Sequence, residues 1–180
     1  MIDDKTLVAE LQNKSTLDRA FRVLMTEYKQ RLYWHIRKIV VIHEDADDVL
    51  QNTFIKVYRN INSFKGESKL YSWLYRIATN ESITLINKRA KHQQIESEEL
   101  QQQLVNNLQA DVYFEGDEIQ WKLQKAIAQL PQKQQLVFNM KYFDNMKYQD
   151  ISEILETSVG GLKANYHHAV KKIEKYLTSN

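Results

Sequence analysis

Apolar residues in the first part of the chain recur at spacings of three, four and seven, which is the period of an amphipathic helix. The repeat covers Leu7, Leu11, Leu17, Phe21, Leu24, Met25, Tyr28 and Leu32, and Tyr33, Ile36, Val40 and Val41 continue it. The acidic segment 43–48 (HEDADD) interrupts it and suits the first turn of a new helix, where the helix dipole favours negative charge. These patterns predict a helical block over residues 1–90.

Two more amphipathic helices are predicted within this block. The first carries its apolar stripe at Leu50, Phe54, Val57, Tyr58 and Ile61. A break at 62–69, which contains Gly66, precedes the second. The second has its stripe at Leu70, Trp73, Leu74, Ile77, Ala78, Ile83 and Ile86, and it ends in the basic run 88–91.

The middle of the chain is polar and acidic, and it shows little sustained periodicity. No Lys or Arg occurs between His92 and Trp121, whereas Glu96, Glu98, Glu99, Asp111, Glu115, Asp117 and Glu118 are acidic. We interpret 92–117 as an acidic flexible linker between a domain at 1–91 and a domain at 118–180; Leu100, Leu104 and Leu108 could form a transient helix in it. About 25 flexible residues span roughly 25–30 Å, which would permit a compact arrangement of the two domains.

The last part of the chain ends in two helices joined by a short turn. An earlier helix is predicted by the spacing of Trp121, Leu123, Ile127 and Leu130. Pro131 suits the start of the next helix, whose apolar residues include Tyr142 and Phe143. A turn is predicted at 144–145. The next helix has one face lined by Tyr148, Ile151, Ile154 and Leu155. A turn at 156–159 follows, in which Ser158 can cap the final helix. The final helix is expected to bury Leu162, Tyr166, Ala169, Val170, Ile173 and Leu177. This arrangement predicts a helix-turn-helix, which places the second helix in the DNA major groove.

Composition narrows the class of protein further. The 180 residues include 4 Gly, 1 Pro and no Cys, which favours an all-α fold of two small helical domains and excludes disulfides, thiolate zinc sites and cysteine nucleophiles. The N-terminus lacks a signal-like apolar run, and no stretch approaches the roughly 18 apolar residues of a membrane helix, so we expect a cytoplasmic protein. The net charge of +2 is too small to imply a polyanion partner by itself.

Three surfaces are candidates for binding; for the first two the alternative is a solvated helix face, and for the third it is that the aromatic rings lie in the core. The final helix leaves donors and cations outward, able to contact base edges or phosphates. The helix at 47–60 carries Asp48, Gln51, Asn52 and Ile55 away from its apolar stripe, as a protein-docking surface would. Aromatic and basic residues interleave from Tyr58 to Arg89, a combination that suits unpaired nucleic acid, although Phe64 and Trp73 are expected in the core.

Taken together, these segments resemble the extracytoplasmic-function (ECF) group of bacterial sigma factors, in the sigma-70 family. The stretch DADDVLQNTFIKVYRNINSFKGESKLYSWLYRIATN (Asp45–Asn80) is similar to the second conserved region of that group. The stretch AIAQLPQKQQLVFNMKYFDNMKYQDISEILETSVGGLKANYHHAVKKI (Ala126–Ile173) is similar to the fourth. The resemblance covers nearly the whole chain.

The resemblance implies a role for each surface in promoter-specific transcription initiation. Docking on the clamp of the largest RNA polymerase subunit would use Asp47, Asp48, Gln51, Asn52 and Ile55. Recognition and melting of the minus-ten element would use Lys65, Gly66, Glu67, Ser68, Lys69, Tyr71, Trp73, Arg76, Asn80, Lys88 and Arg89. Reading of the minus-thirty-five element would use Ser158, Gly160, Gly161, Lys163, Asn165, His167, His168 and Lys171.

The implied partners are core RNA polymerase, through its clamp and the flap of its second largest subunit, promoter DNA and an anti-sigma factor. No cofactor, metal or small-molecule substrate is expected. The chain departs from the group's usual pattern at Glu156, where a small residue or glycine is usual, at Gly161, where threonine is common, and at Asn165 and His168, where arginine is frequent. These departures leave the preferred DNA sequence open.

Two other functions compete with this hypothesis. A free-standing helix-turn-helix regulator would explain residues 118–178 equally well, but it leaves the face around Asp48 and Gln51 unexplained. An enzyme is disfavoured because the chain has no glycine-rich phosphate loop and no cysteine. The adjacent His167 and His168 also diverge by about 100° around a helix, so they cannot easily share a metal ion.

Overall fold

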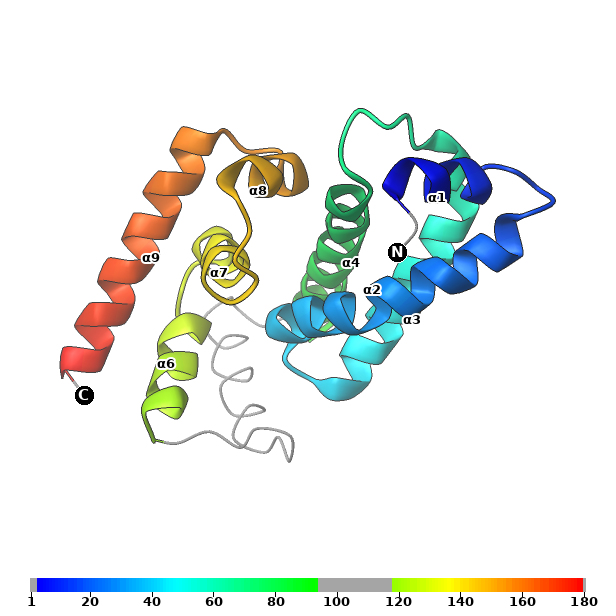
Figure 1. Ribbon diagram of the computed structural model, residues 1–180. Helices are drawn as coiled ribbons and strands as arrows, with labels where there is room; N and C mark the ends of the chain where they lie inside the picture. Colours follow the sequence, from blue (N-terminus) through cyan, green and yellow to red (C-terminus); the bar gives the residue numbers. More distant parts are fainter. Residues whose placement is uncertain (1–2, 94–117, 180) are drawn as a thin grey trace.

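The computed structural model describes residues 3–93 and 118–179, and every regular element within these ranges is helical (Figure 1). This confirms the all-α class predicted from the sequence. The helices of residues 3–93, the N-terminal half, lie together on one side, and those of 118–179, the C-terminal half, lie on the other. None of the helices described is both long enough and apolar enough to cross a lipid bilayer.

Three long helices form the body of the N-terminal half. They are α2 (Leu17–Val40), α3 (His43–Asn60) and α4 (Leu70–Gln93), with the short α1 (Asp4–Leu11) packed against α2. Their apolar stripes meet in a core that contains Leu24, Leu32, Ile36, Val57 and Leu74, all fully buried. The helix α3 begins in the acidic segment, with Glu44 and Asp45 in its first turn, as predicted.

The apolar repeat continues from Leu11 to Leu17, yet the chain breaks between α1 and α2. Polar side chains cause this break by bonding to nearby backbone in place of the helix. The Asn13 carboxamide oxygen accepts from the Ser15 backbone N–H at 3.0 Å, and the Thr16 hydroxyl donates to the Glu10 carbonyl at 2.7 Å. Hydrophobic periodicity alone cannot detect such a competition.

The segment between α3 and α4 is short and is held in place by a side chain from the end of α1. It begins with a 3₁₀ turn, η1 (Ile61–Ser63), and reaches Gly66 in a left-handed conformation at φ +73°. The Gln12 side chain donates to the carbonyls of Ile61 and Phe64, at 3.1 and 2.8 Å. The loop is therefore positioned by a contact that bridges about fifty residues of sequence.

The helix α4 extends further than the sequence pattern predicted. It continues through His92 to Gln93, the first two residues of the predicted linker. The stripe of α4 has no proline or glycine after Leu70 to end it, which explains the extension. The rest of the predicted linker, with Leu100, Leu104 and Leu108, lies outside the described residues.

The C-terminal half consists of short helices against one long one. They are α6 (Glu118–Ala128), α7 (Gln132–Phe138), a π-helical turn η2 (Asn139–Phe143), α8 (Tyr148–Leu155) and α9 (Val159–Ser179). Pro131 precedes α7 as predicted, and Asn145 takes φ +50° in the predicted turn. The prediction that Leu177 is buried was wrong, because it lies one turn beyond Ile173, the last buried residue of α9.

The two halves pack directly on each other. α4 lies against α8 in the centre of the molecule, and α9 lies at the outer edge (Figure 1). Val137, Met140, Ile151 and Ile154 of the C-terminal half join the buried core of the N-terminal half. A second core, between α6, α7 and α9, contains Ala126, Ile127, Leu130, Phe138, Ala169 and Ile173.

Candidate nucleic-acid interface and docking groove

A tight turn sets the angle between α8 and α9. Glu156 ends α8 in a left-handed conformation, with φ 51° and ψ 41°. The Ser152 hydroxyl then donates to the Thr157 carbonyl at 2.7 Å, which fixes the turn against the preceding helix. The Ser158 hydroxyl accepts the Gly161 N–H at 3.2 Å, so it caps α9 as predicted.

The left-handed conformation explains why a glycine is usual at one position where this chain departs from the pattern of the group. Residues with a Cβ pay a steric penalty at positive φ, whereas glycine does not, and helices therefore often end in a left-handed glycine. Glu156 occupies such a position in this chain. Its side chain is 73% exposed and reaches Arg76 of the N-terminal half at 3.1 Å.

The residues predicted to read duplex DNA lie along the first turns of α9, and most of their side chains are free. Exposed residues are Ser158, Gly160, Lys163, His167, His168 and Lys171. Asn165 differs, because it is partly buried and its side chain donates to the Gly161 carbonyl at 2.9 Å. The amide is thus engaged with its own helix, and it must break this contact before it can bind a base edge.

The opposite face of α9 is held by stacked aromatic rings. Tyr166 stacks on Phe138 with ring centroids 5.8 Å apart, and Tyr148 meets it edge-on at 6.4 Å. The Lys163 ammonium lies 5.9 Å from the Tyr148 ring, on the exposed side of the same contact. Burial of the aromatic face therefore leaves the cationic face of α9 outward.

The predicted minus-ten residues divide into three groups in the structure. In the loop, Lys65, Gly66, Glu67 and Lys69 are exposed and Ser68 is partly buried. On the first half of α4, Tyr71, Trp73 and Arg76 are partly buried, and Asn80 is exposed. Lys88 and Arg89 form the third group, near the other end of α4.

The structure does not bring this third group near the loop. Arg89 lies nineteen residues after Leu70 on one straight helix, a separation of about 28 Å at 1.5 Å per residue. Its guanidinium forms an ion pair with Asp45 at the start of α3. Burial raises the pKa of Asp45, although Arg89 opposes this effect, so the pair stabilises the junction of two helices.

Phe64 and Trp73 behave as the sequence predicted only in part. Phe64 is 7% exposed and belongs to the core, as expected. Trp73 packs on it with ring centroids 5.2 Å apart but stays partly exposed. Trp73 therefore lies at the margin of the core and is not fully buried in it.

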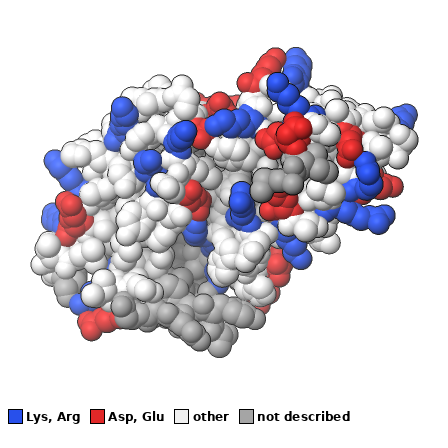
Figure 2. All heavy atoms as spheres, viewed as in Figure 1, with Lys and Arg blue, Asp and Glu red and all other residues white. Residues whose placement is uncertain are grey.

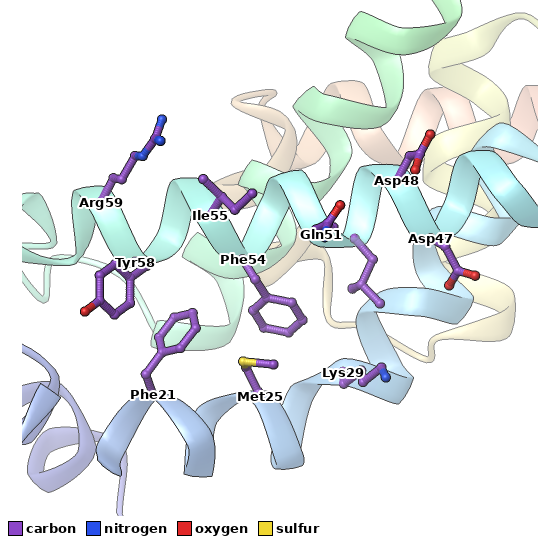
Figure 3. Close-up of a pocket in the computed structure, with 11 residues that line it drawn as sticks. Phe21, Met25, Lys29, Asp47, Asp48, Gln51, Phe54, Ile55, Tyr58 and Arg59 are labelled. Carbon is purple, nitrogen blue, oxygen red and sulfur yellow. The ribbon is translucent and has the colours of Figure 1, made fainter. Parts of the chain in front are cut away.

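A groove runs between α2 and α3, on the surface predicted to bind a protein (Figure 3). It has a volume of ≈ 550 Å³. Asp47, Asp48, Gln51 and Ile55 line it from α3 and are exposed. The fifth predicted residue, Asn52, is exposed on α3 but does not line the groove.

The other wall of the groove comes from α2, and sequence reasoning missed it. Phe21, Met25 and Lys29 face α3 across the groove. Met25 is 37% exposed, although its place in the apolar repeat suggested a core position. The usable signal was the adjacent pair Leu24 and Met25, since two neighbours on a helix cannot share one face.

Charged side chains of both signs are dispersed over the face of the molecule that Figure 2 shows. In the view of Figure 2, lysine and arginine side chains alternate with carboxylates across the face. This agrees with the small net charge of +2. Binding of nucleic acid would then depend on local groups such as those of α9, and it would gain little from long-range attraction.

Among the described residues, no group of three His, Asp or Glu side chains is placed to hold a metal ion. The rings of His167 and His168 have centroids 6.0 Å apart and are tilted by 57°. Fold and surfaces together define the class of protein: an all-helical protein with a C-terminal helix-turn-helix and an N-terminal bundle whose surface carries a groove between α2 and α3.

Comparison with known proteins places the chain within this class. Residues 24–92 match the family described as Sigma-70 region 2, and residues 120–173 match Sigma-70, region 4. The ECF RNA polymerase sigma-E factor of Haemophilus influenzae is 30% identical over 96% of this chain and 94% of its own length. The ECF RNA polymerase sigma factor SigW of Bacillus subtilis is 31% identical, over 88% of this chain and 89% of its own.

Solved structures agree at the level of the fold. CnrH in complex with the cytosolic domain of CnrY has a TM-score of 0.70, at 20% identity and with 98% of each chain covered. The sigma factor RpoE in complex with the anti-sigma factor NepR, from Bartonella quintana, has a TM-score of 0.67 at 20% identity, over 88% of this chain and 96% of that one. The chain belongs to the ECF RNA polymerase sigma factors. It is therefore a non-enzymatic initiation factor, and the free-standing regulator is not favoured.

Proposed function

We propose that this alternative sigma factor divides its work between the two halves of the chain. The N-terminal half, region 2, binds core RNA polymerase and opens the minus-ten element, and the C-terminal half, region 4, reads the minus-thirty-five element. The observation that carries this proposal is that the docking groove and the outer face of α9 lie on different helices and are both exposed. Each can therefore engage its partner without covering the other.

The polymerase clamp is proposed to dock on the exposed face of α3. Asp48 and Gln51 offer a charge and an amide at the rim, and Ile55, 41% exposed, offers an apolar contact beside them. Exposed apolar groups with a polar rim are typical of protein interfaces. Met25 and Phe21, on the α2 wall, extend this surface beyond the residues predicted from sequence. A contact of region 4 with the flap of the second largest subunit is part of the same proposal.

Promoter DNA is proposed to meet two surfaces. The outer face of α9, with Lys163, His167 and Lys171, suits the edges and phosphates of duplex DNA. The loop 65–69 with the partly exposed Trp73 suits an unpaired base of the minus-ten element. Strand separation would be driven by this binding energy, without nucleotide hydrolysis.

An anti-sigma factor is proposed as a further partner, and the cytoplasm as the place where the chain acts. The support is that two solved structures of similar fold are complexes, one with the cytosolic domain of CnrY and one with the anti-sigma factor NepR.

The docking proposal is tested by titrating fluorescently labelled full-length chain with core RNA polymerase. Asp48→Ala and Ile55→Ala should each raise the Kd, by about five- to thirtyfold if they lie in the centre of the interface. Glu174→Ala is the matched control, because it removes an exposed carboxylate on α9, remote from the groove. Equal affinities for all three variants and the wild type would refute the placement of the clamp on α3.

A further inference from the structure

A second cavity, of ≈ 540 Å³, lies where α2, α4 and the turn before α8 meet, and it shares no residue with the groove between α2 and α3. Tyr28, Arg31 and Trp34 of α2 line it at intervals of three residues, so they share one helix face. Tyr71 and Tyr75, four residues apart on α4, line it as well. Its volume lies in the range of small-molecule sites, about 300–1,000 Å³.

Two tyrosines of this cavity are buried, yet their hydroxyl groups have no partner in the protein. Tyr28 is 5% exposed and Tyr75 is 7% exposed. Within the described ranges neither hydroxyl forms a hydrogen bond, and neither oxygen is fully enclosed by protein atoms. Because both residues line the cavity, their hydroxyls open into it. A ligand with oxygen acceptors would satisfy both of them.

The two hydroxyls are available as hydrogen-bond donors. Burial raises the pKa of Tyr28 and of Tyr75 to about 12, so both phenols stay protonated at neutral pH. The ring of Tyr75 is also held by its neighbours, since the His35 ring lies 4.7 Å away and the Tyr71 ring meets it edge-on at 6.0 Å. The Tyr75 hydroxyl therefore has a fixed direction.

Positive charge reaches the cavity from both halves of the chain. Arg31 and Lys147 are exposed at its edge, and neither forms an ion pair with a described residue. The carboxylates of Asp144 and Asp150 line it too, but each is already paired with a lysine. The charged groups of the cavity without an ion-pair partner are thus both cations, and together with hydroxyl donors they suit a phosphate group.

An aromatic ring lies beside these donors. Trp34 is 48% exposed, and the Tyr33 ring holds it edge-on with centroids 5.2 Å apart. Every nucleobase has a flat face that can stack on such a ring. Arg31 lies one helical turn before Trp34 on the same face, so one small ligand can contact both.

We propose that this cavity is a binding site for a nucleoside monophosphate. The base stacks on Trp34, Arg31 and Lys147 hold the phosphate, and the hydroxyls of Tyr28 and Tyr75 donate to oxygen atoms of the ligand. The nucleotide is either a free molecule or part of a DNA strand, because the chemistry of recognition is the same for both. This site goes beyond the proposed function, which assigns no small-molecule ligand to the chain.

Binding can be followed through the fluorescence of Trp34 in the full-length chain. The chain has three tryptophans, so Trp73→Phe with Trp121→Phe leaves Trp34 as the single emitter. AMP is the probe, and adenosine and inorganic phosphate represent its two parts. AMP should quench the emission in a saturable way and bind about tenfold or more tightly than either part, because it engages the ring and the cations together. Calorimetric titration of the unsubstituted chain gives the Kd without the tryptophan changes.

Substitutions of the lining residues test each assigned contact. Arg31→Gln should raise the Kd for AMP by about tenfold or more, because a charge-assisted hydrogen bond is lost. The matched control is Arg22→Gln, an exposed arginine on the opposite face of α2, and it should leave the Kd unchanged. Tyr28→Phe and Tyr75→Phe should each raise the Kd by about two- to tenfold. Tyr142→Phe, at an exposed tyrosine outside the cavity, is the control for this pair.

Thermal unfolding separates a binding role of the hydroxyls from a structural one. A hydroxyl without a partner contributes no hydrogen bond to the fold, so Tyr28→Phe should not lower the Tm of the chain without AMP. Saturating AMP should raise the Tm of the wild type more than that of Arg31→Gln. A lower Tm of Tyr28→Phe without AMP would show that its hydroxyl bonds within the protein, and this would overturn the site.

A short single-stranded DNA with blocked ends distinguishes the two sources of the nucleotide. Displacement of AMP by this DNA would identify a nucleotide of a strand as the ligand, and AMP binding that the DNA does not displace would identify the free nucleotide. No saturable binding of AMP or of the DNA, or equal affinity in the wild type, Arg31→Gln and Tyr28→Phe, would overturn the site. Phosphate that binds as tightly as AMP would overturn the stacking on Trp34. None of these measurements uses polymerase, so their outcome is independent of the proposed function.

Discussion

The left-handed residue at the end of α8 offers a quantitative test of the helix-turn-helix geometry. Glu156 has φ 51° and ψ 41°, and its exposed side chain makes one contact, the ion pair with Arg76. Replacement by Gly and by Ala removes this pair equally. The two variants therefore differ only in how well their backbones accept the left-handed conformation.

The expected difference follows from steric energies. A residue with a Cβ pays roughly 1–2 kcal/mol in this region, and glycine does not. Glycine has the larger conformational entropy in the unfolded chain, which offsets part of that gain at roughly 0.5–1 kcal/mol. Glu156→Gly should thus be more stable than Glu156→Ala by about 0.5–1 kcal/mol, which corresponds to a Tm difference of about 1–4 °C at roughly 2–4 °C per kcal/mol.

An ordinary helical position should give the opposite order. Lys172 is exposed in the interior of α9, and there the glycine variant should be less stable than the alanine variant by about 1 kcal/mol. Urea unfolding followed by circular dichroism measures both pairs under one condition. If alanine matches or exceeds glycine at position 156, the left-handed turn between α8 and α9 is wrong.

Three further predictions concern function, packing and pH. Asp48→Ala should weaken polymerase binding and leave promoter-duplex binding by region 4 unchanged, and Lys163→Ala should do the reverse; equal loss of both activities in both variants would refute the division of labour. Leu162→Ala, at a fully buried position, should destabilise the protein by about 3–5 kcal/mol in urea unfolding, and a loss below about 1 kcal/mol would contradict its place in the core. Burial opposes the effect, but cationic and hydrogen-bonding partners hold the pKa values of Asp144 and Asp150 below 3.8, so their contribution to the free energy of unfolding is present above pH 3.8 and is lost as the pH falls through the lowered values; a free energy of unfolding that does not fall over this range in urea titrations would contradict this.

Local features were the most predictable from the sequence. The acidic start of α3, the proline before α7 and the serine cap of α9 depend on neighbours within one helical turn, and each was predicted correctly. The all-helical class follows from the same kind of pattern, since its 3.6-residue period is read directly along the chain. The assignments of residues to polymerase and to DNA remain predictions.

Features that depend on distant contacts, on the choice of a side-chain rotamer or on an irregular helical turn could not be predicted. His35 and Asp144 are 109 residues apart, and nothing in the spacing of either one indicates the other. Asn165 was expected to face outward, but its side chain bonds to the Gly161 carbonyl, a choice of rotamer that periodicity does not determine. Tyr142 was grouped with an apolar helix, yet it is 56% exposed, because the π-helical turn η2 changes the phase of the helix at that point.

The most direct test of the central claim is run-off transcription with purified bacterial core polymerase and a genomic promoter library, with and without the full-length chain. We predict discrete new start sites that share two spaced upstream elements and that disappear when Asp48 and Ile55 are both replaced by Ala. The absence of any new start, with duplex binding by the protein alone retained, would contradict an action through polymerase.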